Sequence, residues 1–477
     1  MEKKKLSPLF LNAFGIGDFG FAMMTGVETM YWMFFLTNAV KLSLSVTSFV
    51  AGAAGLFDIA WMIVAGLIIQ GTNFKGGKYR PWLLIAPPVV FVTTLFMYWP
   101  FSGNGTMAIV LILVGYIVSH LFYNISYTCH LSMVADYTDD AGERAILSSR
   151  KTMWMSAGNV LFSIAIIPLL DVFGGQSQPT AFFYWIAVVL CIMLFGYLAL
   201  YVLAKPYEIT IPGAGTAEQN ADAAVQGPPP ETMAEAIKVT VTNVPFIILL
   251  LAQIGTSTGM FFMMSGIPYY FQSIFAQTPT FMGMPLMSAY MFVTAIVGII
   301  GAWLAPMISS KFGKKNLYCA GAIINACFIF LVYFMFSSNF PLFLACVAIG
   351  GFINSFGAGL GFAFFADCIT YNIWRTGKSG AGFLMAVASL PIKIAVMLRG
   401  ILMPMLYGVL GVVIDEFGMT GTDPASQAGL KFICLLLPQV LVVVFIVIIF
   451  IFFRLDDKRV AELNADIAAG RAPGLAK

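Results

Sequence analysis

The chain has 477 residues, of which 60% are hydrophobic and 10% are charged, and its net charge is +3. Because a soluble domain carries about 25% charged residues, this composition excludes a water-soluble globular protein and indicates a membrane protein. The two histidines are too few for a metal site of their own, and the seven cysteines form no CxxC pair, so we expect neither a bound metal nor disulfide bonds.

Apolar stretches long enough to cross the hydrocarbon core, which takes about 20 residues, recur along the whole chain. In chain order they cover 11–39, 47–70, 82–101, 107–134, 151–170, 181–204, 245–272, 282–307, 317–337, 340–366, 381–413 and 429–453. The sequence therefore predicts an all-α membrane protein with twelve transmembrane helices.

The only long polar stretch between predicted spans is 205–243, which contains the prolines Pro228–Pro230. Its composition is typical of a flexible connection. We therefore expect an N-terminal six-helix bundle at 1–204, a linker at 205–243, a C-terminal six-helix bundle at 244–453 and a tail at 454–477.

Lys and Arg cluster in alternate connections, for example at Lys75–Arg80, Arg144–Lys151 and Lys311–Lys315. The opposite connections hold only Lys41 and Lys431. Positively charged residues stay on the cytoplasmic side of a membrane. We therefore expect both termini, the linker and the tail to be cytoplasmic, in a multi-pass protein of the bacterial cytoplasmic membrane.

The two halves contain the same short pattern of charged residues. Asp136 follows the fourth predicted span and Asp367 follows the tenth, and an arginine, Arg144 or Arg375, comes eight residues after each aspartate. These matching patterns, in register around a central linker, indicate an internal duplication. Two parallel six-helix repeats are the architecture of major facilitator transporters.

Five ionisable side chains fall inside otherwise apolar stretches: Asp18, Glu28, Asp58, Lys393 and Arg399. A charge near the bilayer centre costs about 2.5–3.5 kcal/mol, so it has to face a partner or a wet cavity. The five therefore indicate a path for a solute or an ion. The internal pairs that we consider are Asp58 with Lys393, Asp18 with Arg150 or Lys393, and Arg399 with Glu28 or Asp367.

His120, Asn124 and Thr128 form a polar stripe at i, i+4 and i+8 of the fourth predicted span. Such a stripe faces a cavity or makes hydrogen bonds to a neighbouring helix. The sequence contains no nucleophile–base set and no phosphate-binding loop. We therefore expect a transporter, and neither an enzyme nor a cofactor.

The first half of the chain contains five short motifs, and Lys393 adds a single position in the second half. The motifs are Gly15-Ile16-Gly17-Asp18-Phe19-Gly20, Phe57-Asp58, Gly77-Lys78-Tyr79-Arg80-Pro81-Trp82, Asn124-Ile125-Ser126-Tyr127 and Ser148-Ser149-Arg150. Over nearly the whole chain they resemble the glycoside–pentoside–hexuronide:cation symporters, the melibiose permease-like family of the major facilitator superfamily. The resemblance implies alternating access to a glycoside pocket between the halves, with cation symport. By analogy with major facilitator folds we expect a monomer.

The resemblance implies solute contact by Asp18 and Arg150, a link between the cation and solute sites at Lys393, and cation coupling at Asp58. Asn124 and Thr128 fall at two further solute positions, and His120 joins them through the stripe. The expected solute-binding residues are therefore Asp18, His120, Asn124, Thr128, Arg150 and Lys393.

The sequence departs from the family pattern around Asp58. Met62 replaces a second aspartate, Trp61 replaces the asparagine before it, and Leu121 replaces a threonine ligand. None of these side chains supplies the oxygen ligands that sodium prefers. The coupling cation is open between a proton and sodium, with Glu28 as a replacement carboxylate. The alternatives are an uncoupled facilitator and a transporter of a non-sugar organic solute.

Charged residues of the basic connections are expected to form a cytoplasmic gate, in which salt bridges lock one state and release in the other. These residues are Lys78, Arg80, Asp136, Arg144, Asp367 and Arg375. The alternative is that they only orient the chain in the membrane.

Overall fold

The structure is a computed structural model. It describes residues 5–72, 74, 77–101, 105–138, 141–207, 233–276, 280–358, 361–378, 384, 387–415 and 418–474. These residues are almost entirely helical. The one exception among the named elements is the two-stranded antiparallel ribbon of β1 (Thr280–Phe281) and β2 (Met284–Pro285).

The helices of the first half follow the predicted spans closely. They are α1 (Pro8–Ala13), α2 (Ile16–Phe34), the π-helical turn η1 (Phe35–Ala39), α3 (Leu44–Gly71), α4 (Trp82–Met97), α5 (Thr106–Tyr137), α6 (Ala141–Val172), α7 (Pro179–Ala204) and the 3₁₀ turn η2 (Lys205–Tyr207).

The second half contains the following elements in addition to the ribbon. They are α8 (Met233–Val241), α9 (Val244–Ile274), α10 (Leu286–Phe312), α11 (Lys314–Leu331), η3 (Val332–Phe336), α12 (Phe340–Ala358), α13 (Gly361–Thr376), α15 (Leu390–Val409), α16 (Pro424–Lys431), η4 (Phe432–Leu436), α17 (Leu437–Phe452) and α18 (Asp457–Ala468).

The helices confirm the predicted all-α membrane fold. Within the described ranges, ten helices are long and apolar enough to cross a membrane, and two shorter apolar helices lie at Trp82–Met97 and Leu286–Gly301. Each corresponds to one predicted span. The predicted eleventh span starts at 381, where several residues lie outside the described part, and its helix α15 begins at Leu390.

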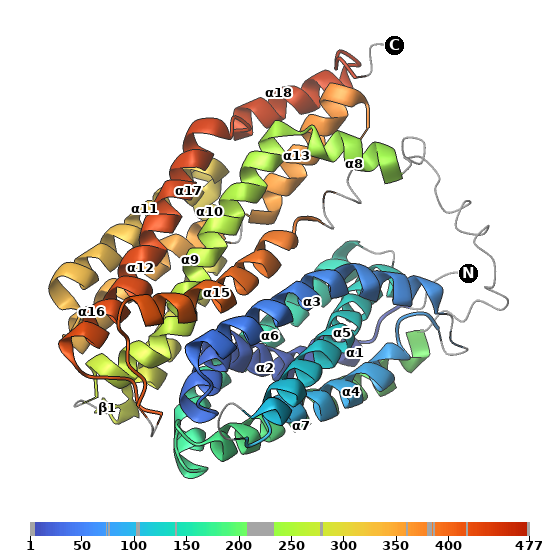
Figure 1. Cartoon of the computed structure of the whole chain (residues 1–477). Coiled ribbons are helices and arrows are strands. Elements are labelled where there is room, and N and C mark those ends of the chain that lie inside the picture. Colours follow the sequence, from blue (N-terminus) through green and yellow to red (C-terminus); the bar gives the residue numbers. More distant parts are fainter. Residues whose placement is uncertain are drawn as a thin grey trace. The chain divides into compact units, whose positions relative to one another are not determined.

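The chain forms two compact units. The first comprises Met1–Gln219, Ile267–Ala295 and Gly400–Gln427, and the second comprises Asn220–Gly266, Ile296–Arg399 and Ala428–Lys477. In Figure 1 the helices α2 to α7 of the first unit form one bundle. The predicted division into bundles at 1–204 and 244–453, joined by a linker, stays a prediction.

Glycines bring the start of α2 into close contact with α6 and α7. A Cβ atom added at Gly15 would lie 2.7 Å from the Cα atom of Lys151, and one at Gly17 would lie 2.6 Å from the ring of Tyr197. From the α7 side, a Cβ at Gly196 would lie 2.7 Å from the carbonyl oxygen of Ile16. The glycines flanking Asp18 therefore allow three helices to approach this carboxylate.

The end of the first span is fastened to later segments of the first unit. The Asn38 side-chain amide donates to the Gly418 carbonyl at 3.0 Å and to Gln272 Oε1 and Thr420 Oγ1, each at 3.1 Å. The hydroxyl groups of Thr37 and Tyr269 lie 2.7 Å apart. Neutral hydrogen bonds thus join η1 to α9 and to the connection after α15.

The second unit has its own apolar core, which extends into the C-terminal tail. Phe246, Cys368, Ile449 and Leu463 are buried together in it. Leu463 belongs to α18, which packs against α13, and the two helices lie beside each other in Figure 1. The tail therefore contains a helix that completes the core of this unit.

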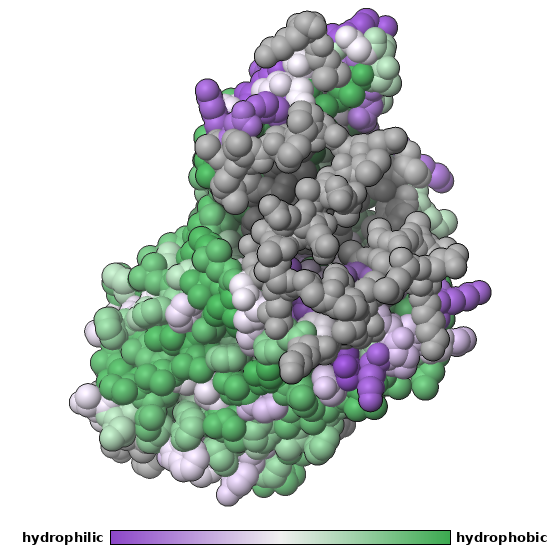
Figure 2. Space-filling model, turned by 90° about the vertical axis from the view of Figure 1, so that its right-hand side faces the viewer, coloured by the Kyte–Doolittle hydropathy of each residue, from purple (hydrophilic) through white to green (hydrophobic). Residues whose placement is uncertain are grey.

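Large apolar side chains also remain on the surface. Val172, Phe195 and Phe334 are all strongly exposed. On the face drawn in Figure 2, hydrophobic residues cover most of the lower described surface, and hydrophilic residues gather towards the upper end. A broad apolar surface of this kind is typical of contact with a membrane.

Gly20→Ala tests the close packing between α2 and α7. The added methyl group would lie 2.9 Å from the carbonyl carbon of Ile192, so we expect a loss of about 1–3 kcal/mol from overpacking. Gly66→Ala on α3 is the matched control, because nothing lies within 4 Å of its added Cβ. Thermal unfolding in detergent should show a lower Tm for Gly20→Ala only; equal Tm values would contradict the packing argument.

Candidate functional site

Asp18 lies near the start of α2 and is fully buried among partners from three other helices. Lys151 Nζ of α6 donates to its Oδ1 at 2.5 Å, and the Tyr197 hydroxyl of α7 donates to the same oxygen at 3.4 Å. His130 Nδ1 of α5 lies 3.3 Å from Oδ2. The structure therefore pairs Asp18 with Lys151 and His130. Its pairing with Arg150 or Lys393 stays a prediction.

Glu28 lies ten residues further along α2 and faces the other histidine. Its Oε2 is 3.6 Å from His120 Nε2, and both side chains are largely buried. His120 Nδ1 lies 3.1 Å from the Tyr116 carbonyl oxygen, which can only accept, so Nδ1 carries a proton. The rings of Tyr116 and His120 stack with centroids 3.6 Å apart. Nε2 is thus directed at the carboxylate.

Asp58 of α3 is buried and meets the polar stripe of α5. Asn124 Nδ2 donates to Asp58 Oδ1 at 3.1 Å and to the His120 carbonyl at 2.7 Å. The amide therefore connects the carboxylate of α3 to the backbone beside the imidazole of α5. We call four of these residues the polar site of the first unit: Glu28, Asp58, His120 and Asn124. Along α2, Glu28 lies ten residues after Asp18.

The residues that replace the family's sodium ligands are engaged elsewhere. The Trp61 indole N–H donates to the Ile117 carbonyl at 2.6 Å. Leu121 packs against an apolar cluster that includes Ala65 and Trp82. Indole and isobutyl groups offer no oxygen to a hard cation. Met62 presents a thioether, which is equally unsuited.

Thr128 and Arg150 lie at the edge of this arrangement. Thr128, the last residue of the stripe, is exposed, and its carbonyl accepts a hydrogen bond from Ser132. The Arg150 guanidinium donates to the Met153 sulfur at 3.4 Å. Their solute contacts stay predictions.

In the second unit, α15 carries both deep cations. Lys393 is half-buried. Arg399 is 2% exposed, and its Nη1 donates to the Ser265 hydroxyl of α9 at 2.8 Å. This hydrogen bond is to a neutral group, and the pairing of Arg399 with Glu28 or Asp367 stays a prediction. The pair of Asp58 with Lys393 stays a prediction.

The expected gate residues of the first half lie at the ends of α4, α5 and α6. Arg80 is nearly buried: its Nε donates to the Tyr201 carbonyl at 2.8 Å, and its guanidinium lies 4.0 Å from the Tyr201 ring centroid. Lys78 Nζ lies 5.8 Å from the Tyr79 ring centroid. Asp136 is half-buried near the end of α5, and the side chain of Arg144 lies outside the described residues.

The gate residues of the second half bind within their own unit. Lys314 Nζ donates to both oxygens of Asp367, at 3.0 and 2.7 Å, and lies 3.4 Å from Asp457. Burial raises the pKa of the Asp367 carboxyl, although Lys314 acts in the opposite direction. Arg375 donates to the Thr242 carbonyl and hydroxyl, just after α8. The gating role of all six residues stays a prediction.

Two functional candidates, His130 and Lys151, were missed from the sequence. A signal for the first was present, because Asp18 and Glu28 are ten residues apart, as are His120 and His130. On two antiparallel helices, equal separations allow both carboxylates to meet both imidazoles. Lys151 had been assigned to a basic connection, although its ammonium group is buried beside Asp18.

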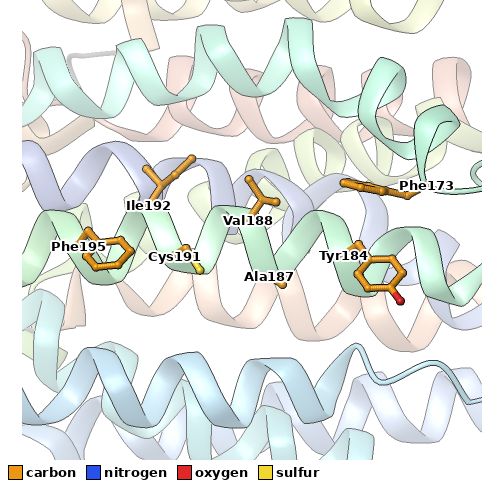
Figure 3. Close-up of a pocket in the computed structure, with 7 residues that line it drawn as sticks. All are labelled: Phe173, Tyr184, Ala187, Val188, Cys191, Ile192 and Phe195. Carbon is orange, nitrogen blue, oxygen red and sulfur yellow. The ribbon is translucent and has the colours of Figure 1, made fainter.

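A pocket of about 520 Å³ lies elsewhere in the first unit, along α7. Figure 3 shows Tyr184, Val188 and Phe195 among the residues that line it, most of them from this one helix. Apart from the Tyr184 hydroxyl and the Cys191 thiol, the side chains of that lining are hydrocarbon. Such an apolar groove on an exposed helix face suits a lipid tail and not a polyhydroxylated solute.

The comparisons with known proteins show the family of the chain. The family model of "MFS/sugar transport protein" matches residues 13–457. A "Putative 2,3-dihydroxypropane-1-sulfonate exporter" of Salmonella typhimurium is 23% identical, covering 96% of this chain and 95% of the relative. A "Putative sulfoquinovose importer" of Escherichia coli is 25% identical, covering 95% and 92%.

The fold also matches solved transporters. The crystal structure of a bacterial homolog of the human lysosomal transporter Spinster superposes with a TM-score of 0.66 at 15% identity, covering 94% of this chain and 96% of that one. The chain therefore belongs to the MFS/sugar transport protein family, within the glycoside–pentoside–hexuronide group that its motifs resemble, and is a multi-pass membrane transporter of a sugar-like solute and not an enzyme.

Proposed function

We propose that this transporter moves a glycoside-like solute by proton symport, as a monomer with both termini in the cytoplasm. The observation that carries the proposal is the polar site of the first unit. Two carboxylates, Glu28 and Asp58, face an imidazole and an amide on α5, at 3.6 and 3.1 Å. All four groups are largely or partly buried. Ionisable groups inside membrane spans are typical of a solute or ion path.

These four groups suit the recognition of sugar hydroxyls. A carboxylate accepts hydrogen bonds from two hydroxyls at once, and an amide both donates and accepts. The ring of Tyr123 stacks against Phe21 at 4.7 Å and His120 at 5.5 Å, which adds an aromatic surface beside them. Glu28 and Asn124 are therefore the first-unit groups that we assign to the solute. Asp18, Thr128, Arg150 and Lys393 stay predicted contacts.

The chemistry around Asp58 favours a proton over sodium. Sodium prefers several oxygen ligands, and Trp61, Met62 and Leu121 supply none. A proton needs only one carboxylate whose surroundings change during the cycle. Asp58, which already accepts a hydrogen bond from Asn124, meets that need. We therefore assign proton coupling to Asp58.

A second candidate is a solute that carries an acidic group. Two relatives bear names that refer to sulfonated compounds, 2,3-dihydroxypropane-1-sulfonate and sulfoquinovose. This chain has two cations on α15, Lys393 and the buried Arg399. A guanidinium group binds sulfonate or carboxylate through two parallel hydrogen bonds. The second unit can thus offer positive charge to an acidic sugar.

The coupling proposal is tested by solute uptake into proteoliposomes under a proton gradient and, separately, a sodium gradient. A glycoside panel identifies the solute first. We expect accumulation with the proton gradient alone. Asp58→Asn should lower that accumulation but retain counterflow, because a neutral amide cannot carry the proton. Asp171→Asn, at the end of α6 and away from the polar site, is the control. Accumulation driven by sodium alone would contradict the proposal.

Glu28→Gln tests the assignment of Glu28 to the solute. Hydrogen bonds to charged groups contribute about 1.5–3 kcal/mol, so the Kd in counterflow or binding should rise roughly 10- to 100-fold. Thr25→Val lies one turn away on α2, where the Thr25 hydroxyl bonds only to the Ala22 carbonyl, and should leave the Kd unchanged. A Kd unaffected by Glu28→Gln removes Glu28 from the solute site.

The choice between neutral and acidic solutes is tested with matched pairs of sugars that differ by one sulfonate or carboxylate. If α15 binds the acidic group, Arg399→Gln should weaken binding of the acidic member by about tenfold or more, since a bidentate ionic contact is lost. Binding of the neutral parent should change little. Equal losses for both members would assign Arg399 to helix packing through Ser265.

A further inference from the structure

Both histidines of the chain face a carboxylate of α2 from α5. His120 meets Glu28, and His130 meets Asp18. Ten residues of helix separate the two pairs on each side, which corresponds to about 15 Å. Between the pairs, Phe21 stacks on Tyr123 and Tyr127, with ring centroids 4.7 and 5.5 Å apart. Aromatic rings thus lie between the pair at His130 and the groups Glu28 and Asn124 that we assign to the solute.

The hydrogen bonds of His130 define which ring nitrogen is available. Nε2 lies 2.9 Å from the Phe14 carbonyl oxygen, which can only accept, so Nε2 carries a proton. Nδ1 lies 3.3 Å from Asp18 Oδ2 and 3.4 Å from Lys151 Nζ. The protonation of Nδ1 therefore decides whether the ring donates to Asp18 or accepts from Lys151.

The two oxygens of Asp18 are not equally satisfied. Oδ1 accepts from Lys151 and from the Tyr197 hydroxyl. Oδ2 is fully buried and accepts no hydrogen bond from any described group in this arrangement. Buried carboxylate oxygens normally have a donor. A proton on His130 Nδ1, which lies 3.3 Å from Oδ2, would supply one.

The charges of the cluster allow it to take up one proton. With a neutral imidazole, Asp18 and Lys151 balance each other, and one added proton gives the site a single positive charge. Among the residues that the structure describes, the other titratable groups that face the cluster are tyrosines. The Lys151 ammonium lies 4.8 Å from the ring centroid of Tyr127, and the His130 ring packs edge-on against Tyr197 at 5.8 Å. Aromatic faces stabilise such cations.

We propose that Asp18, His130 and Lys151 form a proton-binding site of the transporter, in which the proton is held between His130 Nδ1 and Asp18 Oδ2. On binding, a proton from water forms the Nδ1–H bond, and Nδ1 ceases to accept from Lys151. On release, the same proton returns to water, and Lys151 again donates to Nδ1. The role of this site in transport rests on the proposed proton symport, whereas proton binding by the site does not.

Proton binding is measured on the purified full-length protein without any solute. Histidine-selective ¹⁵N labelling gives signals from two side chains only, and His130→Gln identifies those of His130. Over the range of about pH 5–8 in which histidine titrates, we expect His130 Nε2 to stay protonated while Nδ1 gains a proton on acidification. A His130 Nδ1 that stays unprotonated across this range would overturn the proposal.

Two variants give opposite shifts of this titration. Asp18→Asn removes the anion that stabilises the imidazolium, so protonation of Nδ1 should require lower pH. Lys151→Met removes the opposing cation, so protonation should persist to higher pH. Thermal unfolding confirms that each variant is folded, and either folded variant alone tests the proposal. A titration of His130 that is unchanged in the folded variant contradicts it.

The part in transport is tested with His130→Gln in proteoliposomes, with Ser132→Ala as the control on the same helix. We expect His130→Gln to retain counterflow and to move fewer protons per solute than wild type. An unchanged proton-to-solute ratio would overturn the transport role. If wild-type protein moves solute without protons, the proposed symport fails, while the ¹⁵N titration still decides whether the site binds a proton.

Discussion

A charged group inside an apolar bundle is stable only if a partner of opposite charge or a hydrogen bond lies within reach. This constraint organises the first unit. The carboxylates of α2 and α3 meet an ammonium, two imidazoles and an amide that project from α5 and α6. The exterior is apolar for the same reason: the charged side chains lie inside beside their partners, and large aliphatic and aromatic side chains face the lipid.

The fold was largely predictable from the sequence. Hydropathy and length are local properties, so the apolar stretches located all twelve helices, including the short ones at α4 and α10. The similarity of the motifs to the glycoside–pentoside–hexuronide symporters led to the right family. The C-terminal helix α18 was not predicted. Its apolar residues Val460, Leu463 and Ile467 recur at helical spacing, but the helix is too short and too polar for the hydropathy pattern that located the membrane spans.

The partners within the site were harder to predict, because they depend on how each helix is rotated. Adjacent residues on a helix differ by about 100° in direction, so Lys151 faces Asp18 while its neighbour Arg150 contacts Met153. Of the predicted stripe on α5, His120 and Asn124 contact the carboxylates of α2 and α3, whereas Thr128 is exposed. The stripe does not include His130, which lies two residues beyond Thr128 and completes the second carboxylate–imidazole pair. Pairs that would join the two units, such as Asp58 with Lys393, stay predictions.

The glycines around Asp18 have a mechanical consequence. They leave no slack between α2, α6 and α7, so Asp18, Lys151 and Tyr197 form one rigid frame. Helix α5 is held differently, since its single glycine, Gly115, lies against α4 and aromatic rings separate α5 from α2. Helix α5 reaches this frame through side chains, since His130 contacts Asp18 and Lys151. Asn124, which we propose to bind the solute, and His130 lie on this one helix. A displacement of α5 on solute binding would therefore also change the hydrogen-bond distances at His130.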